Sequence, residues 1–260
     1  MNEFQPQDRV TGHFDRAADV YYSWYEMPNP DGHSFRIRRT RCLEALKSVP
    51  QGSTVADIGC GPATFVDDLL RSGYEVIATD IAPHMIEDGR KRFGSAAHVR
   101  FEVAPADKIP TPDGSLAAVS AMGLMEYLND EDAVYREMHR ALKPGGLAIV
   151  TYPHRCSPTR AWNRFTHALV APFLPVLRRG KPVSGVKHRE YDLQPTIDQL
   201  ERAGFKVTDV IFYNFKLGFR PLEHWFPKAT VWVSERLEKY CRTPFLRGIG
   251  TGFILVGTKQ

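Results

Sequence analysis

The strongest restriction on the fold of this chain comes from a short apolar run that ends in a carboxylate and two glycines. Residues 55–65 read Val-Ala-Asp-Ile-Gly-Cys-Gly-Pro-Ala-Thr-Phe, which places Asp57, Gly59 and Gly61 at the end of the run. The run is typical of a strand, the glycines of a tight turn, and the proline of a helix start. Glycine lets a ligand approach the backbone, and a helix N-terminus offers unpaired N–H groups. The stretch predicts a nucleotide-type binding turn, although Gly-x-Gly alone also fits nicotinamide or flavin nucleotides.

The chain then alternates between strand-like and helix-like segments. We expect strands at 54–58, 75–79, 99–103, 116–122, 147–152, 206–215 and 251–258, and helices at 63–72, 83–93, 131–142 and 194–203. Strands that alternate with helices at this spacing form a parallel sheet with right-handed crossovers and helices on both faces. In such sheets a ligand binds beyond the carboxyl ends of the strands. The strand ends are therefore where functional side chains are expected.

Polar groups occur at several of these strand ends. Asp57 ends the first strand, and Asp80 ends the second, 23 residues further along the chain. This spacing is close to that of the carboxylate that binds ribose hydroxyls in dinucleotide-binding folds, where a carboxylate can accept two hydrogen bonds from the diol. Asp107 follows the third strand, where it could hold an exocyclic amine. A Lys143-Pro144-Gly145-Gly146 turn precedes the fifth strand.

These motifs, in this order, resemble the class I S-adenosylmethionine-dependent methyltransferases. The resemblance covers about 54–151 and rests on the stretches 55–61, 78–85, 106–110 and 142–146, with weaker support from 14–22. It implies an α/β fold: a Rossmann-like, doubly wound, mostly parallel seven-stranded sheet with an antiparallel last strand. It also implies S-adenosyl-L-methionine as the cofactor.

The resemblance further implies roles for individual residues. Gly59 and Gly61 would approach the cofactor, Asp57 would organise the site near its amino group, and Asp80 would hold the ribose. Asp107 would contact the adenine amine. Ile81 and Ile109 would lie on either side of the adenine ring, and Tyr21 would be the aromatic residue of an N-terminal lid. The other expected cofactor-binding residues are Met85, Ala106 and Met122.

Composition restricts the class of protein and its surroundings. The 260 residues are 43% hydrophobic and 25% charged, as in globular proteins, and the net charge of +4 does not favour a nucleic-acid partner. The four cysteines form no C-x-x-C pair, so neither a zinc site nor a disulfide framework is indicated. The first residues lack an apolar signal core, and no run reaches 18 apolar residues. We expect a cytoplasmic protein.

The sequence indicates the methyl acceptor less directly than it indicates the cofactor. Methyl transfer from a sulfonium aligns the acceptor with the methyl group and, for hydroxyl or amine acceptors, removes a proton. His154, Tyr127 and His13 are the candidate catalytic residues, with Glu126 as a weaker one. Quinone-pathway methyltransferases that support a metal carry Met-Glu-x-x-Glu-His after strand four, whereas residues 122–127 read Met-Gly-Leu-Met-Glu-Tyr. We therefore expect no metal, and the motifs of DNA methyltransferases are also missing.

We expect one methyltransferase domain over 1–260 with additions around its core. These are an N-terminal helical lid (12–50), the cofactor-binding core (54–152), a basic amphipathic cap insertion (153–190) and a second helical insertion (216–250). Between 155 and 189 there are eight Lys or Arg residues and no Asp or Glu, interleaved with aromatic side chains such as Trp162 and Phe165. A basic amphipathic segment with aromatic anchors suits a peripheral contact with anionic membrane, or a cap over the substrate.

The sequence thus predicts methyl transfer to a small hydrophobic or lipid-like acceptor, favoured at oxygen by His154 and by the lack of nitrogen-acceptor motifs. Two alternatives stay open. One is an N- or C-methyltransferase of a natural product, and the other is a non-catalytic, methyltransferase-like binding subunit.

Overall fold

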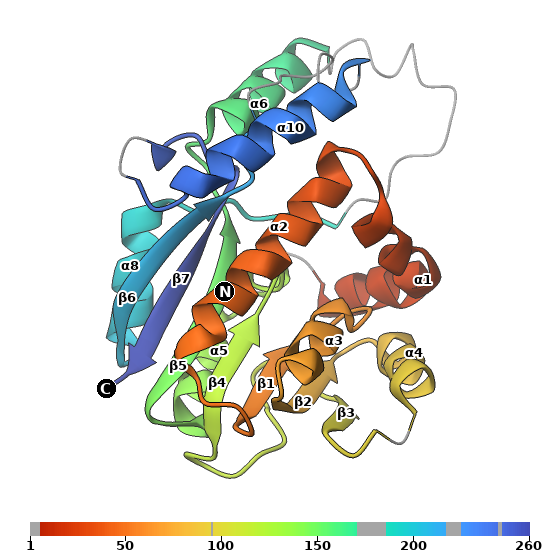
Figure 1. Cartoon of the computed structure of the whole chain (residues 1–260), viewed down its shortest axis with the longest axis vertical. Coiled ribbons are helices and arrows are strands. Elements are labelled where there is room, and N and C mark those ends of the chain that lie inside the picture. The colour runs from red at the N-terminus through yellow and green to blue at the C-terminus, as the bar shows by residue number, and fades with distance from the viewer. Residues whose placement is uncertain (1–5, 95, 171–185, 217–224, 244–245) are drawn as a thin grey trace.

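A computed structural model of the chain describes residues 6–94, 96–170, 186–216, 225–243 and 246–260, without the side chains at 18–21, 167, 169 and 170. Its centre is a seven-stranded sheet of order β3-β2-β1-β4-β5-β7-β6 (Figure 1). Neighbouring strands from β3 to β5 pair in parallel, and β7 is antiparallel to both β5 and β6. The expected Rossmann-like fold class is confirmed. The strands are β1 (Thr54–Ile58), β2 (Glu75–Asp80), β3 (Val99–Val103), β4 (Leu116–Ala121), β5 (Leu142–Pro153), β6 (Phe205–Tyr213) and β7 (Gly252–Lys259).

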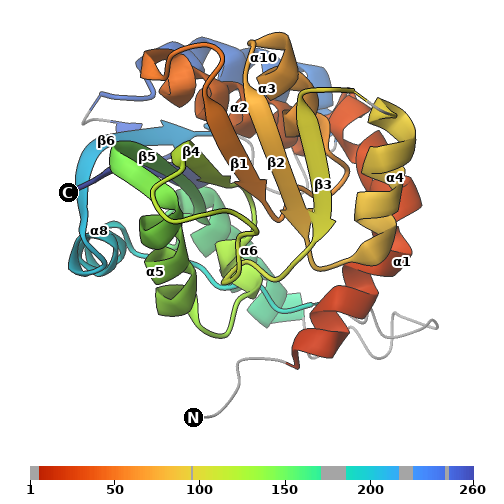
Figure 2. The ribbon, with the colours of Figure 1, turned by 90° about the horizontal axis from the view of Figure 1, so that it is seen from below.

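Helices cover both faces of the sheet. Figures 1 and 2 show α2 and α3 on one face and α5 and α8 on the other, while α1 lies beside α4 near the carboxyl ends of the strands. The helices are α1 (Gln7–Glu26), α2 (Pro30–Ala45), α3 (Thr64–Arg71), α4 (Pro83–Phe93), α5 (Glu131–Ala141), α6 (Pro158–Val170), α8 (Leu193–Arg202) and α10 (Pro227–Leu237).

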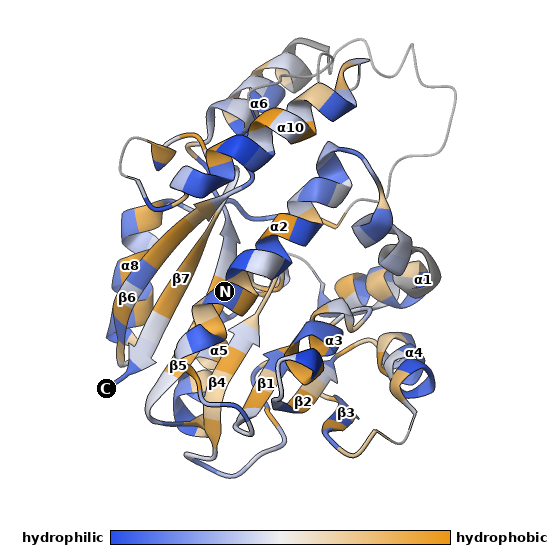
Figure 3. Ribbon diagram, in the orientation of Figure 1, coloured by the Kyte–Doolittle hydropathy of each residue, from blue (hydrophilic) through white to orange (hydrophobic). Residues whose placement is uncertain are grey.

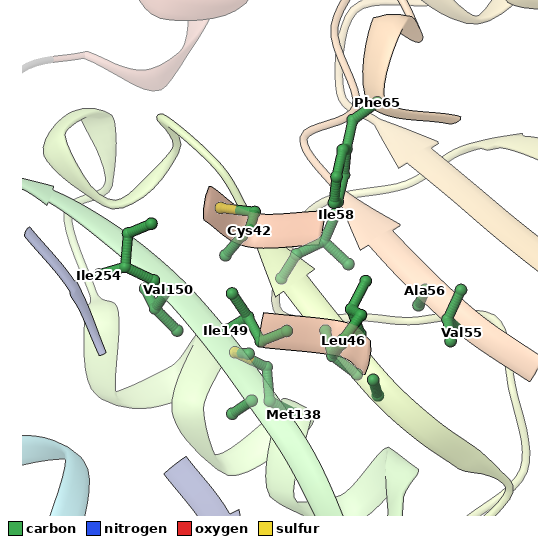
Figure 4. Packing of buried hydrophobic residues seen from close by; sticks show 14 of the residues in the cluster. Cys42, Leu46, Val55, Ala56, Ile58, Phe65, Met138, Ile149, Val150 and Ile254 are labelled. Carbon is green, nitrogen blue, oxygen red and sulfur yellow. The ribbon is translucent and has the colours of Figure 1, made fainter. Parts of the chain in front are cut away.

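One large apolar cluster fills the space between the sheet and its helices. Figure 3 shows the apolar residues concentrated in the strands, with polar residues on the outer sides of the helices. In Figure 4, Cys42 and Leu46 approach from the N-terminal part of the chain, close to Ile58, and Val150 lies beside Ile254. All five side chains are almost completely buried. Burial of apolar surface therefore holds the strand ends at fixed positions.

Several boundaries differ from those read from the sequence. Helix α1 begins at Gln7, five residues before the start of the helical lid expected at 12–50. Helix α2 begins at Pro30, because the Asn29 side chain accepts a 2.8 Å hydrogen bond from the Gly32 N–H and caps the helix. Strand β5 begins at Leu142, which pairs with Leu116, so Lys143 lies in a strand and not in the last turn of a helix.

The second insertion is fastened to the core by a buried carboxylate. Glu238 follows α10 and accepts a 2.6 Å hydrogen bond from the Asn214 N–H, while the Arg41 guanidinium lies 3.4 Å from its other oxygen. Burial raises the pKa of Glu238 to about 7, and Arg41 opposes this shift. This contact joins α2, the end of β6 and the α10 region. Helix α6 lies in the expected cap segment, of which residues 171–185 are outside the described residues.

Candidate active site

The turn after β1 has the backbone that its glycines predict. Gly59 and Gly61 have φ values of 67° and 50°, and Ala63, before α3, also has a positive φ of 54°. A Cβ on Gly59 would lie 2.9 Å from Leu124, whereas one on Gly61 would meet nothing within 4 Å. The turn therefore leaves open space directly beside Gly61, where a ligand can approach the backbone.

Asp80 joins this turn to the end of β2. Its carboxylate accepts a 2.9 Å hydrogen bond from the Gly61 N–H and another of 2.9 Å from the Ala82 N–H. Burial raises the pKa of Asp80, and these backbone N–H groups oppose the shift. Asp80 thus holds the glycine turn in place. Each of its two oxygens can still accept a further hydrogen bond from a ligand beside the turn.

Asp57 lies deeper than the other carboxylates. It is 1% exposed, and the Ser120 hydroxyl donates a 2.6 Å hydrogen bond to its Oδ1 atom. Its Oδ2 atom is buried and makes no hydrogen bond within the described residues. Burial raises the pKa of Asp57 to about 7. Asp57 is therefore a buried, partly satisfied carboxyl group beneath the glycine turn, and in the described part of the chain it lines neither of the two cavities that follow.

The strand ends surround a first cavity of about 300 Å³. The residues of the expected cofactor-binding set that line it are Gly59, Gly61, Asp80, Ile81, Met85, Ala106, Asp107 and Met122. Ile109 is buried in the core and does not line it, and the side chain of Tyr21 lies outside the described residues. Helix α1 adds Gln7, Val10 and Phe14 instead. Sequence reasoning missed the first two because it began the helix too late.

A second cavity, of about 330 Å³, shares part of its wall with the first. The shared residues are Phe14, Arg38, Gly123 and Tyr127. Phe14 and Tyr127 pack edge to face with ring centroids 4.9 Å apart. The second cavity continues past Trp24, Phe35 and Arg160 toward a wider opening beside α6. Two ligands could therefore meet at this wall, one from each side.

The second cavity contains titratable side chains with few protein partners. Glu126 is 5% exposed, and its Oε2 atom makes no hydrogen bond within the described part of the chain. Burial raises the pKa of Glu126, and Arg38 opposes the shift. His188 lies against the Tyr127 ring at 4.9 Å, and burial lowers the pKa of its imidazole. His13 also lines this cavity, and burial lowers its pKa.

His154 lies elsewhere. The structure places it outside both cavities, 4% exposed, with its Nδ1–H donating a 3.0 Å hydrogen bond to the Gly250 carbonyl. The ring packs edge-on against Phe212 and Phe253. Its place at the end of β5 was anticipated, but its side chain is enclosed between strands. His188 was missed, because only the folded chain brings it back beside the turn that carries Tyr127.

Within the described ranges, no three His, Cys, Asp or Glu side chains gather in a way that could hold a metal ion. No helix in those ranges is long and apolar enough to cross a membrane.

The strand order, together with the glycine turn held by the carboxylate at the end of β2, is that of the class I methyltransferase fold. Residues 55–146 match the model of a family described as a methyltransferase domain. A ubiquinone biosynthesis O-methyltransferase of Xanthomonas axonopodis is 26% identical over 202 residues, which cover 75% of this chain and 81% of that protein. The ubiquinone/menaquinone biosynthesis C-methyltransferase UbiE of Azotobacter vinelandii is 35% identical over 147 residues, 52% of this chain and 57% of that protein.

For several other similar O-methyltransferases, the chain spans only 60% of their length. Among solved structures, a possible histamine N-methyltransferase of Thermotoga maritima has a TM-score of 0.63 at 20% identity, covering 96% of this chain and all of that one. Geranyl diphosphate C-methyltransferase of Streptomyces coelicolor has a TM-score of 0.57 at 17% identity, covering 86% and 78%. These structures support the fold alone.

Residues 55–146 are therefore a methyltransferase domain, set in the fold of the class I S-adenosylmethionine-dependent methyltransferases, and the enzyme uses S-adenosylmethionine as its cofactor. Residues that line the first cavity fit this cofactor. Gly61 leaves open space beside the backbone, Asp80 places a carboxylate next to it, and apolar side chains such as Ile81 can pack against the adenine ring. When bound, the cofactor supplies an electrophilic methyl group.

Proposed function

We propose that the enzyme transfers this methyl group to a hydroxyl oxygen of a small hydrophobic or lipid-like acceptor in the second cavity. One observation carries the proposal: the second cavity shares a wall with the first and contains the buried Glu126 carboxylate, one oxygen of which has no hydrogen-bond partner among the described residues. The cavity is otherwise rich in aromatic side chains, among them Trp24, Phe35 and Tyr127. The name of the Xanthomonas relative, a ubiquinone biosynthesis O-methyltransferase, supports an oxygen acceptor.

The chemistry requires alignment and the loss of one proton. The acceptor oxygen forms a bond to the methyl carbon as the carbon–sulfur bond breaks, and the hydroxyl proton passes to a base. The acceptor therefore has to present its hydroxyl near the wall formed by Phe14 and Tyr127. The two rings pack edge to face there, so the wall presents mainly aromatic ring surface to the reacting groups.

We assign the base role to Glu126. A raised pKa suits a carboxylate for accepting a proton near neutral pH, and its Oε2 atom has no competing hydrogen bond in the described residues. The backbone of Glu126 is held in place, because its carbonyl accepts a 3.1 Å hydrogen bond from the Arg189 N–H. His188 is the second candidate, while His13 and Tyr127 line the cavity as weaker ones.

A methyl-transfer assay tests this function. The enzyme is incubated with tritiated S-adenosylmethionine and a metabolite and lipid extract, and the labelled product is identified by mass spectrometry. An O-methyl product supports the proposal. A product methylated at nitrogen or carbon would support the natural-product alternative, and tight cofactor binding without any labelled product would support a non-catalytic subunit.

Isosteric variants then separate the possible bases. Glu126→Gln should lower turnover by about 100-fold with unchanged cofactor affinity, since general base catalysis contributes 10²–10⁴-fold. His188→Asn tests the second candidate. His154→Asn is the control, because His154 lies outside both cavities, and it should retain turnover in the fraction of protein that folds.

We also propose peripheral contact with anionic membrane through residues 155–189. Trp162 and Phe165 on α6 are 40% and 57% exposed, as expected for interfacial anchors. Arg160 and Arg164 both pair with Glu190, so the aromatic side chains carry more of this argument than the arginines. Sedimentation with phosphatidylglycerol vesicles should show binding that is lost in the double variant W162S/F165S. Absence of binding by the wild-type protein would remove the idea.

A further inference from the structure

Helix α1 is fastened to the start of α4 by one carboxylate. Asp15 accepts a 3.0 Å hydrogen bond from the His84 backbone N–H, and its second oxygen lies 2.6 Å from the His84 Nδ1 atom. The two residues are 69 positions apart in the sequence. We call this pair of contacts the α1–α4 clasp. Figure 2 shows the two helices side by side at the edge of the sheet.

The clasp supplies a cap that α4 lacks locally. The residue before the helix is Ala82, which has no side chain able to accept from the first N–H groups, and Pro83 follows it. The His84 N–H would otherwise lack a partner within its own helix. A carboxylate at a helix N-terminus also meets the favourable end of the helix dipole. Asp15 thus provides from α1 the interaction that an N-cap residue normally provides from the same helix.

The residue next to Asp15 forms part of both cavities. Phe14 packs on Ala82 and Met85 beside the first cavity and on Tyr127 beside the second. Because consecutive residues of a helix move together, the position of Phe14 depends on how firmly Asp15 is held. A second contact supports the same alignment further along α1, where the Arg92 guanidinium lies 4.3 Å from the centre of the Tyr22 ring.

We propose that Asp15 is a positioning residue of the methyl transfer: through the α1–α4 clasp it seats Phe14 in the wall that the cofactor cavity and the acceptor cavity share. The proposal rests on the function proposed above, since it takes the two cavities as the sites of these ligands. Asp15 itself lines neither cavity in the described part of the chain. Its effect on the reaction is therefore exerted through Phe14 and α1.

The clasp should respond to pH. His84 is 65% exposed and faces Asp15 from α1 and Glu87 and Asp88 from its own helix. The hydrogen bond and charge of Asp15 raise the pKa of His84 above its usual 6.5. The pair is therefore ionic below about pH 6.5 and loses the charge on His84 as the pH rises through the raised pKa. Around Asp15, Arg16 is the neighbouring cation and Asp80 of β2 the nearby carboxylate.

Three variants separate the backbone contact of the α1–α4 clasp from its side-chain contact. Asp15→Ala removes both contacts and should weaken S-adenosylhomocysteine binding about tenfold and raise the KM for the acceptor, because Phe14 lines both cavities. Asp15→Asn keeps an oxygen for the His84 N–H and should recover part of the affinity. His84→Ala keeps the backbone bond and should abolish the decline in affinity as the pH rises above 6.5. Calorimetry at several pH values measures all three.

The chain offers a matched control. His98 Nδ1 lies 2.6 Å from Glu75, the same distance as in the Asp15–His84 pair, and the His98 side chain is 69% exposed against 65% for His84. This pair lies between β2 and the start of β3 and touches neither cavity lining. His98→Ala should therefore leave the affinity and its pH dependence unchanged.

Hydrogen exchange separates failure of this proposal from failure of the proposed function. In the protein without ligand, Asp15→Ala should speed amide exchange across residues 7–17, whereas His98→Ala should not. If Asp15→Ala changes neither this exchange nor the cofactor affinity, or lowers only the melting temperature, the positioning role is wrong. If the wild-type protein binds no cofactor while the exchange result holds, the clasp stands and the methyltransferase function is what fails.

Discussion

The Ser120 hydroxyl donates a 2.6 Å hydrogen bond to Asp57 Oδ1, whereas Asp57 Oδ2 is buried and unpartnered within the described residues. The two residues face each other across neighbouring parallel strands, in register. The carboxyl group is thus only partly compensated for its burial, which raises its pKa to about 7. A group in this state costs stability when it is ionised.

Replacing Asp57 by asparagine should stabilise the protein in the absence of cofactor. The folded state holds the Asp57 proton more tightly than the unfolded state does, so this group lowers stability as the pH rises from about 3.8 to about 7. Asp57→Asn should raise the free energy of unfolding by roughly 2–4 kcal/mol at pH 8 and by much less at pH 4. Urea denaturation at both pH values measures this. An equal effect at the two pH values would contradict the argument.

Removing the Asp80 carboxylate should weaken cofactor binding. In Asp80→Ala the N–H groups of Gly61 and Ala82 lose their acceptor, and the proposed ribose contact is lost with them. We expect the cofactor to bind about 100-fold more weakly, since the two hydrogen bonds that the ribose hydroxyls are proposed to donate to the charged carboxylate are lost. Asp107→Ala, an exposed lining residue, should cost less than tenfold by the same scale. Calorimetry with S-adenosylhomocysteine decides, and an unchanged affinity in Asp80→Ala would refute the assignment.

A methyl group on Gly61 should block the cofactor with little effect on folding. Its φ of 50° strains any other residue by about 1 kcal/mol, and a Cβ there meets no protein atom but points into open space. Gly61→Ala should therefore lose cofactor affinity by much more than it loses stability. Gly145→Ala is the control, since Gly145 has a φ of 75° and equally open surroundings away from both cavities. Similar affinity losses in both variants would contradict the close approach.

Gly123 should control the position of Arg38. A Cβ at Gly123 would lie 2.7 Å from Arg38 Nη1, and its φ of 70° adds backbone strain. In Gly123→Ala the guanidinium has to move from the wall shared by the two cavities. We expect kcat/KM to fall about tenfold, or 1.4 kcal/mol. Arg38→Met should produce a similar loss without changing the backbone, and full activity in Gly123→Ala would show that the guanidinium position is unimportant.

The sheet could be read from the sequence because its signals are local. The strand at Thr54–Ile58 lies between turn residues on both sides, and its bounds were predicted correctly, as were those of Val99–Val103. The strand-end aspartates of the first cavity follow from the same alternation. Helix α1 was begun too late, although Val10 and Phe14 have the i,i+4 spacing that indicates one helix face.

The second cavity could not be read in the same way, because it depends on contacts between distant segments. His188 reaches Tyr127 only because the chain returns after the cap, where the Arg189 N–H bonds to the Glu126 carbonyl and the Tyr191 N–H to the Pro153 carbonyl. No spacing in the sequence reports this return. For His154 the sequence predicted the position but not the surroundings. It follows the end of a strand as expected, but the antiparallel pairing of β5 with β7 encloses its ring.

Phe14 and Tyr127, which stand between the cavities, have a thermodynamic consequence. Any ligand that shifts these rings changes the shape of both cavities, so the binding free energies of the two ligands are coupled. Such coupling is reciprocal: the factor by which cofactor changes acceptor affinity equals the factor by which acceptor changes cofactor affinity. If the acceptor occupies the second cavity as proposed, loss of the methyl group alters the contact at this wall, and the affinity for the product in one cavity should change with the state of the cofactor in the other.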